Sequence, residues 1–86
     1  MFLLIDIGNT KTKWMLRDDK SIYKQDTFFT EDIDQDHFEF DEKIKKILIS
    51  NVAGFEKEAI LKIKLKNSNI EFEINIDRRT TNWVLG

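Results

Sequence analysis

The sequence predicts an α/β domain in which a five-stranded mixed sheet carries two helices. Three observations support this fold class. The chain opens on a nearly continuous apolar stretch at residues 2–7, two strand-like segments follow closely at residues 12–17 and 21–29, and residues 46–76 have the pattern of strand, helix and strand. A length of 86 residues allows one small domain. We therefore interpret residues 1–86 as a single unit.

The first three segments predict an antiparallel meander. Residues 2–7 are almost entirely apolar, which is typical of a strand that is buried on both faces. Residues 12–17 place Trp14 and Leu16 on one face, because side chains alternate along a strand. Residues 21–29 are rich in aromatic and β-branched side chains, as a third strand would be. The Asp18-Asp19-Lys20 segment forms the turn between the second and third strands.

The second half of the chain predicts a strand–helix–strand crossover. Residues 46–51 are expected to form a strand, and residues 55–66 show apolar side chains at helical spacing. The expected buried stripe of this helix consists of Phe55, Ala59, Ile60, Ile63 and Leu65. Residues 70–76 alternate between apolar and polar side chains, so we expect an edge strand with one face in water.

Two further segments complete the pattern. Phe40, Ile44 and Ile47 fall at helical spacing, so we expect a short helix to start near Phe40. The polar tail contains Arg78 and Arg79, whose charge suits a phosphate. We expect a loose chain end instead, because termini are usually poorly ordered unless they are packed.

Composition narrows the classes of function. The formal net charge of −2 provides no general attraction to nucleic acid or to anionic membranes, so we expect neither partner. No apolar stretch approaches the ~20 residues that a membrane span needs, and the apolar start lacks the basic lead of a signal peptide. The chain has no cysteine, which excludes disulfides and thiolate metal sites. These features predict a cytoplasmic protein.

The segment from Asp6 to Lys13 carries the strongest chemical signal. It joins the first two predicted strands, and a turn at this place can hold phosphate through backbone amides. The predicted phosphate-binding residues are Asp6, Ile7, Gly8, Asn9, Thr10, Lys11, Thr12 and Lys13. Gly8 permits a close approach of the backbone to a ligand, the threonines add donors, and the lysines offset phosphate charge. Asp6 is the candidate ligand for a divalent cation.

A plain hairpin explains the same segment equally well. Gly8-Asn9 between two apolar stretches is a common hairpin signal, with glycine suited to the first central position of a type II′ turn. Residue pattern alone therefore leaves both interpretations open.

The opening of the chain resembles the amino terminus of type III pantothenate kinases. The residues that carry this resemblance are Met1 to Thr10, with Asp6, Gly8, Asn9 and Thr10 matching an Asp-x-Gly-Asn-Thr motif, and Lys13-Trp14, which resembles the Bvg accessory factor-like subset. Residues 47–52 are also similar to the fourth strand of that family and the turn after it. The resemblance implies a ribonuclease H-like, actin-like ATPase domain with the strand order 3-2-1-4-5 and the first strand at its centre.

The same resemblance implies a function. Family members transfer phosphate from ATP, with Mg²⁺, to pantothenate in the first step of coenzyme A biosynthesis. They also use a monovalent cation, K⁺ or NH₄⁺, and form a homodimer. Asp6 would hold the Mg²⁺, and the following turn would bind the β- and γ-phosphates.

The sequence departs from the family in its second half. The family's catalytic Gly-x-Asp-Arg segment and its second phosphate turn have no counterpart here, although Leu85-Gly86 matches the start of such a segment. We find no catalytic residue in the chain, and we expect an amino-terminal domain or fragment that is inactive alone. The alternative is a non-catalytic regulatory or interaction protein that keeps the kinase-like fold.

Overall fold

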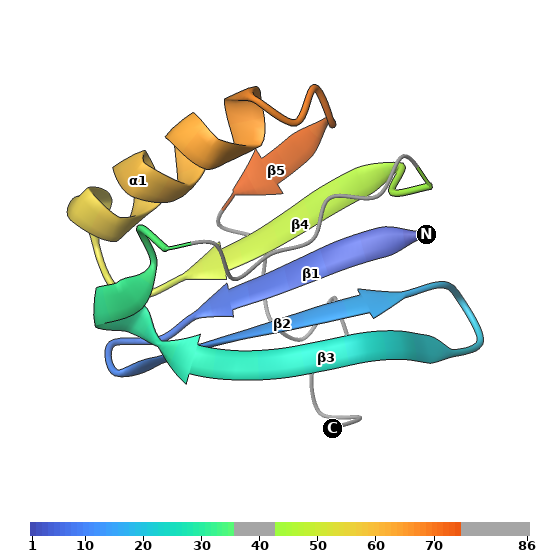
Figure 1. Ribbon diagram of the computed structural model, residues 1–86, viewed down its shortest axis with the longest axis horizontal. Coiled ribbons are helices and arrows are strands. Elements are labelled where there is room, and N and C mark those ends of the chain that lie inside the picture. Colours follow the sequence, from blue (N-terminus) through green and yellow to red (C-terminus); the bar gives the residue numbers. More distant parts are fainter. Residues whose placement is uncertain (36–42, 75–86) are drawn as a thin grey trace.

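The computed structural model describes residues 1–35 and 43–74, which form a five-stranded mixed sheet with one α-helix (Figure 1). The elements in chain order are β1 (Phe2–Ile7), β2 (Lys11–Arg17), β3 (Ile22–Phe29), the single-turn 3₁₀ helix η1 (Thr30–Asp32), β4 (Lys46–Asn51), α1 (Phe55–Lys66) and β5 (Phe72–Ile74). The α/β class and the five-stranded mixed sheet are therefore confirmed.

The strand order is β3-β2-β1-β4-β5, which is the order that the family resemblance implies. β1 pairs with β2 and β2 with β3 in antiparallel fashion, whereas β4 runs parallel to β1 and β5 runs parallel to β4. The apolar β1 takes the central position, because only a strand without polar alternation can be covered on both faces. β5 is an edge strand as predicted; it begins at Phe72, two residues after the expected start at Ile70, and residues 75 and 76 lie outside the described part.

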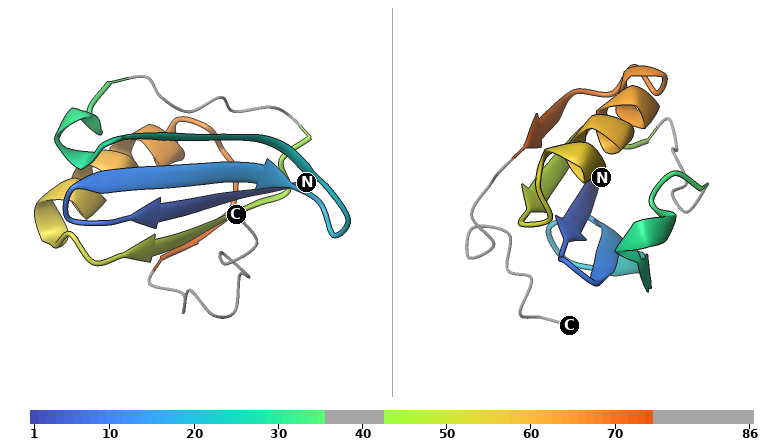
Figure 2. Two further views of the ribbon diagram at one scale, coloured as in Figure 1. Left: turned by 90° about the horizontal axis from the view of Figure 1, so that it is seen from below. Right: turned by 90° about the vertical axis from the view of Figure 1, so that its left-hand side faces the viewer.

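The core lies between the sheet and one layer that contains α1 and η1. Figure 2 shows α1 and η1 on the same side of the sheet. Buried side chains of this cluster are Leu3, Ile5, Ile7, Trp14, Ile33, Ile44, Ile47, Ile49, Leu61 and Leu65. A smaller apolar cluster on the opposite face contains Leu4 and Met15, with Phe2 and Leu48 beside them. Successive residues of β1 thus enter different clusters, as strand alternation requires.

The predicted helix 55–66 exists, but its predicted buried face is confirmed only at Leu65 and, in part, at Ile60. Phe55 is 88% exposed and Ile63 is 66% exposed, whereas Leu61 and Leu65 are fully buried. Leu61 and Leu65 stand four residues apart, so both project from one face of the helix toward the sheet. Phe55 lies in the first turn of the helix and takes no part in that contact.

The expected second helix is not confirmed. Phe40 lies outside the described residues, Ile44 is buried in the segment before β4, and Ile47 belongs to β4 itself. Residues Arg78 and Arg79 also lie outside the described part. No helix among the described residues is both long enough and apolar enough to cross a lipid bilayer.

Candidate functional site

The candidate site lies at the sheet edge where β1 and β4 end. These two strands are parallel neighbours, so the turn after each of them reaches the same edge (Figure 1). The backbone amide of Val52 donates to the carbonyl oxygen of Ile7 at 3.0 Å, which joins the two turns directly. The predicted phosphate turn therefore meets the loop that leads into α1, a neighbour that sequence motifs alone did not identify.

The β1–β2 turn is a tight hairpin closed by Gly8 and Lys11. The Gly8 amide donates to the Lys11 carbonyl oxygen at 3.0 Å, which leaves Asn9 and Thr10 at the tip. A β-carbon added to Gly8 would lie 2.8 Å from that carbonyl oxygen, so the site needs glycine. Positive φ values among the described residues occur at Gly54 and Asn69, so the type II′ interpretation with Gly8 at a central position is wrong. Gly8 thus allows a close approach to the Lys11 backbone of the same hairpin, and not to a ligand as predicted.

Thr30, the first residue of η1, fixes this hairpin from outside. Its hydroxyl donates to the Gly8 carbonyl oxygen at 2.8 Å, and its amide donates to the Thr10 carbonyl oxygen at 2.8 Å. The Thr30 and Thr12 hydroxyls share a hydrogen bond of 2.9 Å, and both side chains are buried. Thr12 was predicted to contact phosphate. The structure instead places its side chain in this internal network, on the same face as Trp14.

The tip of the hairpin presents its polar groups to solvent. Asn9, Thr10 and Lys11 are exposed. Within the described part of the chain, no hydrogen bond is donated by the backbone amides of Asn9 and Thr10. The Ile7 side chain is fully buried in the core, so only its backbone belongs to the turn. The network around Thr30 engages carbonyl groups and leaves two consecutive amides at the surface, an arrangement that attracts anions.

Asp6 lies one residue before the end of β1, on the face opposite α1. It is half-buried, and its register partners are Lys13 on β2 and Ser50 on β4. Lys13 is also half-buried, so a cation and an anion stand side by side at the base of the hairpin. No group of three metal-ligating side chains exists within residues 1–35 and 43–74. A lone carboxylate such as that of Asp6 can hold Mg²⁺ only together with phosphate oxygens and water, which is how this ion usually binds beside nucleotides.

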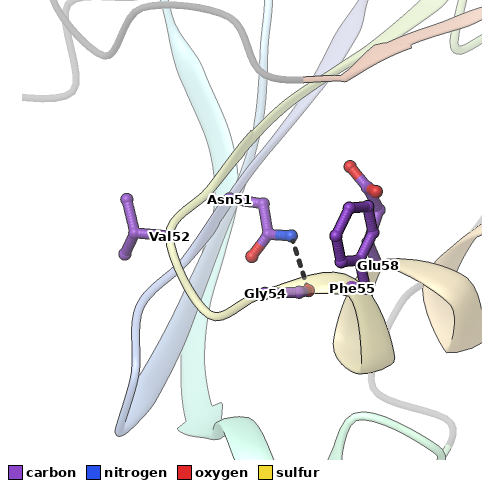
Figure 3. Close-up of a pocket in the computed structure, with 5 residues that line it drawn as sticks. All are labelled: Asn51, Val52, Gly54, Phe55 and Glu58. Atoms are coloured by element: carbon purple, nitrogen blue, oxygen red, sulfur yellow. Dashed lines mark hydrogen bonds between the residues drawn. The ribbon is translucent and has the colours of Figure 1, made fainter.

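A shallow pocket of about 310 Å³ lies beside the hairpin, where β4 passes into α1. Figure 3 shows the Asn51 side chain turned toward Gly54, with its amide donating to the Gly54 carbonyl oxygen at 3.1 Å. The Asn51 side-chain oxygen also accepts from the Ala53 amide at 2.8 Å, so Asn51 closes the loop. Gly54 has φ = 91° and precedes the first turn of α1.

The side chains that line this pocket make it a poor site for a phosphate group. Its lining includes the carboxylate of Glu58 and the apolar side chains of Val52 and Phe55. A carboxylate beside the helix N-terminus repels a phosphate that the amides there would otherwise attract. The hairpin tip is therefore the better anion site at this edge. Asn51 and Gly54 were not predicted as site residues, although an asparagine followed three residues later by a glycine at the end of a strand predicts a turn there.

The structure thus brings Asp6, Gly8, Asn9, Thr10, Lys11 and Lys13 to one end of the sheet, while Ile7 and Thr12 support them from the interior. A scan of the chain against protein-family models finds no match, and a search of curated proteins finds none.

Proposed function

We propose that this chain is the amino-terminal, phosphate-binding part of an ATP-dependent pantothenate kinase. The observation that carries the proposal is the hairpin tip, where the Asn9 and Thr10 amides face solvent beside Lys11. A concavity of backbone amides with an adjacent cation suits a phosphate group. The ribonuclease H-like, actin-like ATPase architecture is part of this proposal, and the observed strand order supports it.

Each residue of the hairpin has a role in this scheme. The Asn9 and Thr10 amides and the Lys11 side chain contact the β- and γ-phosphates, and Asp6 orients Mg²⁺. Lys13 stands beside Asp6 and offsets negative charge at the base of the turn. Phosphoryl transfer depends mainly on positioning and electrostatic stabilisation, so a rigid turn is the part that this chain contributes. The buried Thr12–Thr30 network keeps the turn in place.

Pantothenate, the monovalent cation and a cytoplasmic location enter the proposal through the sequence resemblance. The catalytic acid or base also belongs to a part of the enzyme with no counterpart in this chain. We therefore expect weak ATP binding and no pantothenate-dependent release of ADP from residues 1–86 alone. Measurable ADP release by the purified chain would contradict the proposal that the catalytic acid or base lies outside this chain.

A titration of the isotopically labelled chain with Mg²⁺-ATP, followed by amide NMR, tests the phosphate turn. We expect shifts at Asn9, Thr10 and Lys11 that saturate weakly, and no shifts at the β2–β3 turn of residues 18–21. Lys11→Gln should weaken binding several-fold, whereas the matched change Lys20→Gln at the other turn should have no effect. Equal responses at the two turns, or none at millimolar ATP, would refute the proposal and favour the interaction-protein alternative.

The role of Asp6 is tested separately with Mn²⁺-ATP, because bound Mn²⁺ broadens nearby resonances. In the unmodified chain we expect broadening centred on Asp6, Ile7 and Gly8. Asp6→Asn retains size and hydrogen bonding but removes the charge that the cation needs. The broadening should therefore disappear in this variant while Tm changes little. In an enzyme that contains this domain, the same change should severely lower turnover. If Asp6→Asn were destabilised but retained the broadening, Asp6 would not be a ligand of the divalent cation.

A further inference from the structure

Helix α1 presents apolar side chains on two faces. Leu61 and Leu65 are buried against the sheet, whereas Phe55 is 88% exposed and Ile63 is 66% exposed. Ala59 is also exposed, and it lies midway between these two exposed residues in the helix. Side chains four residues apart are neighbours on a helix surface, so Phe55, Ala59 and Ile63 form one apolar row on the outside of α1. We call these three residues the outer row.

The outer row is not needed for the contact between α1 and the sheet. One apolar stripe is enough to hold a surface helix against its core, and Leu61 and Leu65 supply it. Single apolar side chains are common at protein surfaces. Apolar side chains that adjoin one another on an exposed face, by contrast, are typical of a site that binds another molecule. The outer row therefore indicates a second contact of α1.

The sizes of the three side chains suit a second helix. Ala59 is small and lies between the larger Phe55 and Ile63, which leaves a gap at the middle of the row. In helix pairs, side chains of one helix occupy such gaps in the other. The row spans about 12 Å along the helix axis, so a partner helix of about three turns covers it. At the N-terminal end of the row, Val52 and Phe55 also line the pocket of about 310 Å³, which extends the surface available to an apolar side chain (Figure 3).

The charged side chains beside the outer row differ on its two sides. Glu56 and Lys62 each lie three residues from Ala59, so they flank it on opposite sides. Lys66 stands four residues after Lys62, on the same side of the row, and both lysines are exposed. The Lys62 ammonium lies 3.9 Å from the Glu58 carboxylate, and no ion pair of Lys66 is present within the described part of the chain. One flank of the row is therefore basic and the other is not.

This asymmetry distinguishes between possible partners. A helix with carboxylates along one edge complements the flank formed by Lys62 and Lys66. An amphipathic helix that lies on an anionic membrane carries cations around its apolar face, and such a surface would repel Glu56. In a two-fold antiparallel pair of α1 helices, equivalent flanks face each other, so the lysines of one copy would oppose those of the second. Charge therefore favours an acidic helix over a membrane or a second copy.

We propose that the outer row of α1 docks an amphipathic helix of a partner protein, and that this helix carries carboxylates along one flank. A large apolar side chain of the partner fills the gap over Ala59, and its acidic flank lies along Lys62 and Lys66. Binding of an apolar helix face in this way is a common mode of peptide recognition. Three apolar residues and two lysines are far fewer than the about 20–30 residues a side of a standard interface, so the contact is weak and reversible. This inference is independent of the proposed kinase function, because the hairpin tip takes no part in it.

Two synthetic helical peptides of about five turns test the docking surface. Both carry leucines at helical spacing on one face; one has glutamates along one flank of that face, and the matched peptide has lysines there. Each is titrated into the isotopically labelled chain and followed by amide NMR. We expect the glutamate peptide to shift the amides of residues 55–66, and the lysine peptide to bind at least about tenfold more weakly. Equal binding of the two peptides, or no binding at millimolar peptide, would overturn the inference.

Variants of the outer row provide a second test, with circular dichroism as the check on folding. Ala59→Gln fills the gap but retains a good helix former, so it should fold and bind the glutamate peptide about tenfold more weakly. Ile22→Ser, which removes an exposed apolar side chain from β3, is the matched control and should leave binding unchanged. The double variant Lys62→Glu with Lys66→Glu should prefer the lysine peptide. A double variant that still prefers the glutamate peptide would overturn the inference, as would an Ala59→Gln variant that binds normally.

Two further measurements test the other possible partners. Vesicles of phosphatidylserine and phosphatidylcholine test a membrane, and sedimentation velocity over a range of protein concentrations tests a second copy. We expect no vesicle binding and no self-association that depends on the outer row. Vesicle binding that Ile63→Ser abolishes would assign the row to a lipid surface and overturn the inference. A dimer that Ile63→Ser dissociates would assign it to a second copy and overturn it equally.

Discussion

The two hairpin turns of the meander are built in opposite ways. The β2–β3 turn is closed by its own first residue: Asp18 Oδ1 accepts from the amides of Lys20 and Ser21 at 2.8 Å each, and Oδ2 accepts from the Tyr23 hydroxyl at 2.5 Å. The β1–β2 turn has no such carboxylate at its tip. It is held through the carbonyl oxygens of Gly8 and Thr10 by Thr30, a residue of another element.

This difference separates a turn built for stability from a turn that can receive a ligand. In the second turn, an anion already occupies the amides, and its hydrogen bonds have a measurable consequence. The Tyr23 hydroxyl, followed by the amides of Lys20 and Ser21, lowers the pKa of Asp18 from 3.8 to about 2. In the first turn, the fixed groups are carbonyls, so amides remain at the surface for an external anion.

The largest effect on stability is expected for Thr30→Val, which removes the hydroxyl that fixes the first turn but retains the side-chain shape. The Gly8 carbonyl and the buried Thr12 hydroxyl then lose a partner. Each buried polar group left unsatisfied costs about 1–3 kcal/mol, so we expect the free energy of unfolding to fall by about 3 kcal/mol. Urea unfolding with an unchanged m value measures this loss.

Thr30→Ser is the matched control, because serine keeps the hydroxyl and removes one methyl group. We expect it to retain most of the stability that Thr30→Val loses. Equal losses in the two variants would mean that packing around the methyl group, and not the hydrogen-bond network, stabilises the first turn.

Gly8→Ala should produce the next largest effect. The added methyl group would meet the Lys11 carbonyl oxygen at 2.8 Å, and because this atom belongs to the backbone, the hairpin must open slightly. Overpacking of this kind typically costs about 1–3 kcal/mol. Asn9→Ala, at the exposed tip of the same turn, should change the unfolding free energy by less than about 0.5 kcal/mol. If both variants were equally stable, the tight approach at Gly8 would not matter for the fold.

The sheet could be predicted because each strand has a local pattern. The nearly continuous apolar run of β1 predicts a central strand, and the alternation in 70–76 predicts an edge. The direction of Thr12 was also accessible from the sequence. It stands two residues before Trp14, so strand alternation places both on the core face, and the prediction of Thr12 as a phosphate donor overlooked that simpler rule.

Thr30 could not be found in the same way. It lies 22 residues from Gly8, and no local pattern indicates which distant hydroxyl will reach a given turn. The helix face shows a related limit: several apolar side chains fit a helical stripe on α1, and only the position of the sheet beneath it selects Leu61 and Leu65 over Phe55 and Ile63. Tertiary packing determines both the position of Thr30 at the first turn and the buried face of α1, so neither could be predicted from a local pattern.

Asp18→Asn should lower stability less than the two changes in the first turn, and its effect should depend on pH. The folded-state pKa of Asp18 is depressed from 3.8 to about 2, so the carboxylate's contribution is present above pH 3.8 and is lost as pH falls through about 2. The difference in unfolding free energy between the unmodified chain and Asp18→Asn should therefore shrink between pH 4 and pH 2. A difference that stays constant over this window would show that the charge of Asp18 does not stabilise the turn.

Tyr23→Phe should have the smallest effect on stability. It nevertheless tests which hydrogen bond lowers the pKa of Asp18 in the second turn. The change removes the hydroxyl that donates to Asp18 Oδ2 but keeps the aromatic ring, which is 56% exposed and contributes little packing. Because this hydroxyl is the main cause of the depressed pKa, the pKa of Asp18 should rise from about 2 toward 3.8, while the Lys20 and Ser21 amides hold it partly down. Carboxyl-carbon NMR titration measures the shift, and carboxylates outside the turn should titrate alike in both proteins. An unchanged Asp18 titration would assign the depression to the two amides. The anion-holding power of the second turn would then come from its backbone, as we propose for the first turn.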